Sequence, residues 1–133
     1  MIPADFATIA EAALAAMTEH AQLLGVRGAA VVAWATLEPA QHWTSQMRVV
    51  GAMTKGNSNL IAIAYSKAAE MADTLRDSGS GIRPALHGEH GYKGGMIRAL
   101  AGGHILAVFS GATGEQDIEI AQAAFRIFTQ HYH

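Results

Sequence analysis

The chain has 133 residues, of which half are apolar and 15% charged, no cysteine and a formal net charge of −2. The lack of cysteine excludes disulfides, thiol nucleophiles, iron–sulfur clusters and cysteine-ligated zinc. No Lys/Arg run is present and no apolar stretch approaches the ~20 residues that span a bilayer, so we expect neither nucleic-acid nor membrane partners. We predict a single cytoplasmic domain over residues 1–133, and the low charged fraction favours a homo-oligomer.

The first part of the chain predicts a helix followed by a hairpin. Residues 5–24 carry an apolar stripe at three- and four-residue steps, with Asp5 as the N-cap. Residues 28–36 (GAAVVAWAT) have the small and β-branched composition of a buried strand, and residues 41–53 form its partner. On that second strand we expect Trp43 to face the core and Met47, like Met53, Met71 and Met96, to fill it.

A second helix and an irregular segment follow. The helix is predicted over residues 58–76, and Ser78-Gly79-Ser80-Gly81 is interpreted as a flexible linker that ends it. Residues 82–95 (IRPALHGEHGYKGG) are rich in glycine and proline and show no clear period. Long irregular segments inside a domain are more often functional or interfacial than not.

The last part of the chain predicts a second hairpin and a closing helix. Residues 96–100 and 105–109 pair around Gly102-Gly103, which we interpret as a two-residue turn. A final helix is predicted over residues 115–130, with Glu115 and Asp117 complementing its positive end. Helix, hairpin, helix, loop, hairpin, helix is an α+β order. It favours an antiparallel sheet with helices packed on it, in a profilin-like layered arrangement.

Three segments carry a family resemblance. The sequence SGATGEQD at residues 110–117, and the helix that follows it, resembles the C-terminal signature of the GlcG/HbpS family. Ser58 with the later Lys67-Ala68 pair resembles the second helix of that family, and Gly94-Gly95 matches the glycines before its final hairpin. Where many relatives have a threonine shortly after the Lys-Ala pair, this chain has Glu70.

The resemblance implies a small homo-oligomeric protein that binds haem, because haem binding is reported for some members of the family. Some relatives are described as haem-degrading, and others have no settled role. The threonine that Glu70 replaces is one reported haem-contacting residue, so the resemblance leaves the mode of binding open.

Five side chains are candidate cofactor ligands or contacts. Imidazole binds haem iron, so His87 and His90 are candidates, although a plain polar loop is the commoner explanation of such a pair. Tyr92 is a possible oxygen ligand to ferric haem. Lys67 and Arg98 are candidates to pair with propionates, with ordinary solvent-facing side chains as the default alternative.

Three functions follow from these observations. The first is a binding protein for haem or another planar or anionic ligand, with its cleft near residues 82–98. The second is a structural protein that keeps the fold and the oligomer but has lost the ligand site. The third is a weak haem-degrading enzyme, although no constellation of nucleophile, base and oxyanion stabiliser is visible in the sequence.

Overall fold

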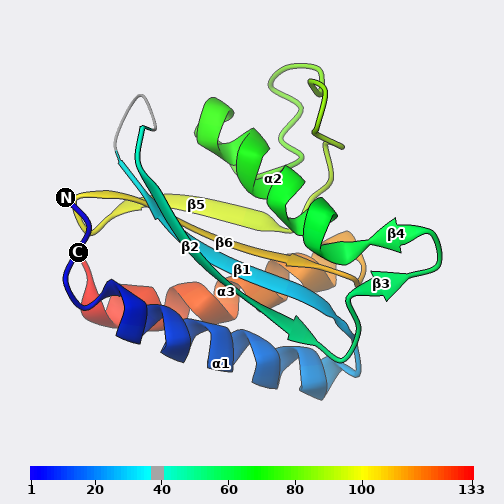
Figure 1. Ribbon diagram of the computed structural model, residues 1–133, viewed down its shortest axis with the longest axis horizontal. Helices are drawn as coiled ribbons and strands as arrows, with labels where there is room; N and C mark the ends of the chain where they lie inside the picture. Colours follow the sequence, from blue (N-terminus) through cyan, green and yellow to red (C-terminus); the bar gives the residue numbers. More distant parts are fainter. Residues whose placement is uncertain (37–40) are drawn as a thin grey trace.

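The computed structural model describes residues 1–36 and 41–133, which form a four-stranded antiparallel sheet with three helices, as Figure 1 shows. The strands lie in the order β2-β1-β6-β5, and a separate two-stranded ribbon, β3-β4, precedes the second helix. The elements are α1 (Phe6–Leu24), β1 (Gly28–Ala35), β2 (Trp43–Val50), β3 (Thr54–Lys55), β4 (Ser58–Asn59), α2 (Leu60–Thr74), β5 (Gly95–Leu100), β6 (Gly103–Ser110) and α3 (Gly114–His131). The predicted α+β class, antiparallel sheet and element order are confirmed.

The sheet is covered on both faces, by α1 and α3 on one side and by α2 on the other (Figure 1). Side chains alternate along a strand, and every residue of β1 is buried. Ala30, Val32 and Trp34 pack under α1 and α3. Val31 and Ala33 pack under α2. The run of small and β-branched residues in β1 therefore reflects a central strand that is buried on both faces.

The edge strand β2 contradicts the prediction that its apolar residues belong to the core. Trp43 is 38% exposed, and Met47, Val49 and, beyond the strand, Met53 are also exposed. The reason is that α2 packs mainly on β1, β6 and β5, so it leaves the outer part of β2 uncovered. Period-two alternation identifies which residues share a face of a strand, but not whether another element covers that face.

The β5–β6 turn falls one residue earlier than predicted. Leu100 pairs with Gly103, so the two turn residues are Ala101 and Gly102, with φ angles of 58° and 72°. Gly103 belongs to the strand, and it must be glycine because a Cβ there would lie 2.4 Å from the carbonyl oxygen of Ala35. A glycine pair thus serves two needs here: positive φ at the first position and close backbone approach at the second.

Ala101→Gly is expected to stabilise the protein by about 0.5–1 kcal/mol. A left-handed conformation costs a residue with a Cβ roughly 1–2 kcal/mol, and glycine offsets part of that gain by its larger entropy when unfolded. Urea denaturation measures the effect. Ala99→Gly, at an exposed position in the ordinary strand β5, is the matched control and should destabilise. Equal destabilisation by both substitutions would contradict the role given to the turn.

The ends of α1 and α2 are fixed in ways the sequence did not indicate. Asp5 occupies the N-cap position of α1 without a capping side-chain hydrogen bond, and its carboxylate accepts instead from the Tyr132 hydroxyl at 2.8 Å. That contact joins the two ends of the chain. The N-cap of α2 is Asn59, whose side chain accepts from the Ala62 N–H at 3.1 Å.

Candidate functional site

The α2–β5 loop, residues 75–94, runs beside α2 and is held there by hydrogen bonds (Figure 1). Ser78 is buried, and its N–H and hydroxyl exchange hydrogen bonds with the backbone of Gly95 at 3.2 and 2.9 Å. The N–H of Gly79 donates to Glu70 Oε2 at 2.8 Å. The interpretation of residues 78–81 as a flexible linker is therefore wrong, because two of them are anchored to α2 and β5.

Glu70 is a buried residue of α2 that supports this loop. One carboxylate oxygen accepts from Gly79, and the other, Oε1, has no hydrogen-bond partner within the described residues. Glu70 thus anchors the α2–β5 loop to α2.

Arg83 links the tip of the loop to the C-terminal end of α2. Its guanidinium donates to both oxygens of Glu89 at 2.7 and 3.0 Å and to Asp73 at 2.8 Å. Hydrogen bonds from Arg83, and then from the Leu86 N–H, lower the pKa of Glu89 from its usual 4.5 to about 2. His87 and His90 flank this carboxylate in sequence, and both are exposed.

Acid is expected to release the loop before it unfolds the sheet. The pKa of Glu89 is lower in the folded than in the unfolded chain. Its ionised carboxylate therefore stabilises the folded loop fully above pH 4.5, and this stabilisation is lost as pH falls towards 2. The protection factors of the loop amides, which correct each exchange rate for its intrinsic pH dependence, should therefore stay high at pH 5 and fall towards pH 2. Glu89→Gln should give fast loop exchange already at pH 7. Slow loop exchange in that variant at pH 7 would contradict the anchor.

A buried ion pair joins α2 to α3. Lys67 is 3% exposed, and its Nζ donates to Asp117 Oδ2 at 2.9 Å and to the carbonyl oxygen of Phe109 at 2.8 Å. Asp117 Oδ1 accepts from the Ala112 N–H at 3.0 Å. Burial lowers the pKa of Lys67 and raises that of Asp117, and the attraction between the two charges opposes both shifts. The default view of Lys67 as a solvent-facing side chain is therefore wrong.

Beside this pair lies a cleft of about 500 Å³, which we name the α2–α3 cleft. The middle of α2, the end of the α2–β5 loop, the β3 ribbon and the start of α3 surround it. Side chains that line it include those of Lys55, Lys67, Tyr92, Lys93, Ser110 and Asp117. Three lysines, one tyrosine and two serines, Ser58 and Ser110, therefore line one cavity, together with the acidic residues Asp117 and Glu115.

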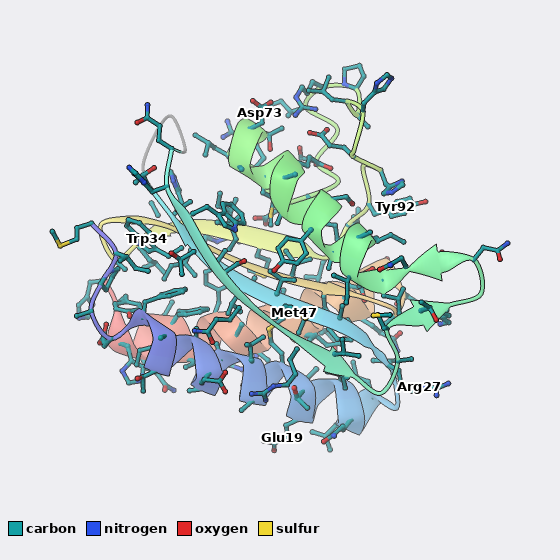
Figure 2. The ribbon with its side chains drawn as sticks, viewed as in Figure 1. Glu19, Arg27, Trp34, Met47, Asp73 and Tyr92 are labelled. Atoms are coloured by element: carbon teal, nitrogen blue, oxygen red, sulfur yellow. The ribbon has the colours of Figure 1, made fainter. Side chains whose placement is uncertain are left out.

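The structure brings together only some of the predicted site residues. Lys67 and Tyr92 line the cleft, and the His90 ring stacks on Tyr92 with centroids 5.1 Å apart. Figure 2 shows Tyr92 on the loop beside α2, where 52% of it is exposed. His87 is exposed on the loop and is not one of the residues that line the cleft. Arg98 lies elsewhere: it pairs with Asp77 and covers the ring of Phe125 on α3 at 5.9 Å.

Sequence reasoning did not identify Lys55, Lys93 and Ser110 as cleft residues. It also did not identify Asp117 as the partner of Lys67. None of them stands in a recognisable motif of catalysis or metal binding. The available signal was indirect: two of the segments that carry the family resemblance, at residues 58–68 and 110–117, meet at the Lys67–Asp117 ion pair.

Residues 1–36 and 41–133 contain no set of three or more His, Asp or Glu side chains placed to hold a metal ion. Among the helices in those residues, none combines the length and the apolar character needed to cross a bilayer. In comparisons with known proteins, no family model, no curated protein and no solved structure matches this chain.

Proposed function

We propose that this protein binds a planar, carboxylate-bearing small molecule, of which haem is the first candidate, in the α2–α3 cleft. The observation that carries the proposal is the convergence of three lysines and the Tyr92 ring on one cavity of about 500 Å³. Cavities of this size and mixed character are typical of small-ligand sites. The resemblance to the GlcG/HbpS family supports haem, and the cleft lies where two of the three resembling segments meet.

The cleft residues fit haem in their chemistry. A tyrosine oxygen is an established ligand of ferric haem, and Tyr92 presents one at the rim of the cleft. Lys55 and Lys93 offer ammonium groups for charge-assisted bonds to the propionates. The His90 ring, stacked on Tyr92, limits how that phenol can turn. Bound haem would supply a redox-active iron; the chain's own residues hold and orient it.

Self-association is part of the same proposal. The exposed Trp43, Met47 and Val49 lie on β2, and β2 is an edge strand of the sheet. An exposed apolar strip on an unpaired edge is a typical contact surface between protein chains. A homo-oligomer in the cytoplasm remains the prediction made from the sequence, and light scattering on the purified protein tests the oligomer.

Titration of the purified full chain with hemin tests the function. We expect a shifted Soret band that saturates with the protein. Tyr92→Phe removes the phenolate ligand but keeps the ring, so it should change the position of the band and weaken binding about tenfold or more. His87→Ala is the matched control, because His87 lies outside the cleft, and it should leave the spectrum unchanged.

The other outcomes are equally specific. A Soret shift that depends on His90 and not on Tyr92 would reassign the iron ligand to the imidazole. No Soret shift in the wild-type chain would eliminate haem. Tight oligomers without a ligand retained on purification would then favour the second candidate, a structural protein that keeps only the fold.

A further inference from the structure

We name as the inner end of the α2–α3 cleft the part lined by Lys67, Ser110, Gly114 and Glu115. It contains hydrogen-bond donors that have no acceptor among the described protein atoms. A lysine ammonium has three N–H donors. Within residues 1–36 and 41–133, Lys67 Nζ has two acceptors, the Phe109 carbonyl and Asp117 Oδ2. Because Lys67 is 3% exposed and lines the cleft, its third donor needs an acceptor that comes from the cleft.

The first turn of α3 contributes two more donors. Thr113 and Gln116 form a capping box, in which each side chain accepts from the other residue's N–H. The next N–H, that of Asp117, donates to the Thr113 carbonyl at 2.8 Å. The N–H groups of Gly114 and Glu115 remain without an acceptor in the described part of the chain, and both residues line the cleft. Free amides at a helix N-terminus attract anions.

Ser110 adds a hydroxyl from the end of β6. It is 3% exposed and lines the cleft, and no described residue forms a hydrogen bond with its side chain. It continues the alternation of Leu106 and Val108, the residues of β6 that face α2. A serine that is 3% exposed, that lines a cavity and whose hydroxyl has no hydrogen-bond partner within the described residues is a second and independent sign that a ligand atom belongs there.

Asp117 holds these groups together. Its Oδ2 accepts from Lys67 and its Oδ1 from the Ala112 N–H, so one carboxylate fixes the ammonium beside the turn that begins α3. Lys67 neutralises the charge of Asp117, and Lys55 and Lys93 add positive charge at the rim against the exposed Glu115. The inner end thus presents donors from an ammonium, a hydroxyl and two amides.

We propose that this inner end is a carboxylate-binding subsite, in which Lys67, Ser110 and the Gly114 and Glu115 amides share the two carboxylate oxygens. This inference rests on the proposed function, since it assigns one end of the same cleft. The carboxylate has two possible sources, a free small carboxylic acid or a propionate of haem, and the experiment below distinguishes them.

Acetate titration of the ¹⁵N-labelled full chain is the direct test. We expect saturable amide shifts at Gly114, Glu115 and Ser110, and no such shifts with acetamide, the neutral analogue. Acetate shifts that are absent, that are spread evenly over the surface, or that acetamide reproduces would overturn the subsite.

A proline substitution removes one donor without disturbing the helix. Proline suits the first position of a helix, where its missing N–H is not needed by the helix itself. Thr113 already has the extended ψ of 162° that a residue before proline requires. Gly114→Pro should weaken acetate binding about 2–10-fold, as expected for one hydrogen bond. Gly114→Ala keeps the N–H and should bind as the wild type does; equal binding by all three chains would contradict the role of this amide.

Hemin and its dimethyl ester identify the source. Weaker binding of the ester, together with weaker hemin binding by Gly114→Pro, shows that a propionate occupies the subsite. Acetate binding without hemin binding shows a free carboxylic acid and removes haem from the proposed function. Hemin binding that depends on Tyr92, with no acetate effect and no loss with the ester, overturns the subsite and leaves the proposed function standing.

Discussion

Replacing Lys67 with methionine is expected to lower the free energy of unfolding by about 3–5 kcal/mol, because it leaves the carboxylate of Asp117 buried without its cation. Asp117 is 4% exposed, so water from the cleft only partly replaces the lost ammonium. Domains of this size are stable by roughly 5–15 kcal/mol, so the loss is a large fraction of the total. Urea denaturation followed by circular dichroism measures it.

A double-mutant cycle separates the ion pair from general packing. Asp117→Asn keeps an oxygen that accepts from the Ala112 N–H but removes the negative charge. As a single substitution it therefore leaves the buried Lys67 ammonium without a counter-charge. The double variant Lys67→Met with Asp117→Asn contains neither charge and should lose much less than the sum of the two single variants. A coupling energy of about 1–3 kcal/mol is expected for such partners. Additive losses would show that the two charges do not stabilise each other.

Gly94→Ala is expected to cost about 2–6 kcal/mol. Gly94 has a φ of 125°, and a Cβ there would lie 2.5 Å from Lys67 Nζ and 2.6 Å from Asp117 Cβ. The positive φ costs a residue with a Cβ about 1–3 kcal/mol, and the forced displacement of a buried side chain costs a similar amount. Residue 94 therefore has to lack a side chain for the Lys67–Asp117 ion pair to form.

Gly81→Ala is the control for this substitution. Gly81 has a φ of 72° in the same loop, but a Cβ there would meet no atom within 4 Å. It should cost only the roughly 1–2 kcal/mol of a left-handed conformation. If both variants lose the same stability, backbone strain alone explains Gly94, and the close approach to Lys67 has no energetic weight.

The fold was predictable because its signals are local. Apolar periods of three to four residues mark α1 and α3, the buried run marks β1, and glycines mark the turns. The errors arose where a distant element decides the outcome. Trp43 is exposed because α2 does not cover β2, and Ser78 is fixed because Gly95, 17 residues away, bonds to it.

The candidate site was predictable only in outline. The segment that holds Tyr92 and the helix that holds Lys67 were identified, but Arg98 packs on Phe125 of α3, away from the cleft. Lys67 and Asp117 are 50 residues apart, and no periodicity relates them. Their pairing depends on how α2 and the start of α3 pack at one end of the sheet, which is a tertiary property.

One measurement tests the central claim that the α2–α3 cleft is the ligand site. Gallium(III) protoporphyrin IX, a diamagnetic stand-in for haem, can be titrated into the ¹⁵N-labelled full chain while all amide resonances are followed. We predict that the largest shifts map to Lys55, Tyr92, Lys93, Ser110 and Gly114, which line the cleft. Shifts centred on Trp43 and Met47 of β2, or on Arg98 of β5, with the cleft amides unmoved, would contradict it.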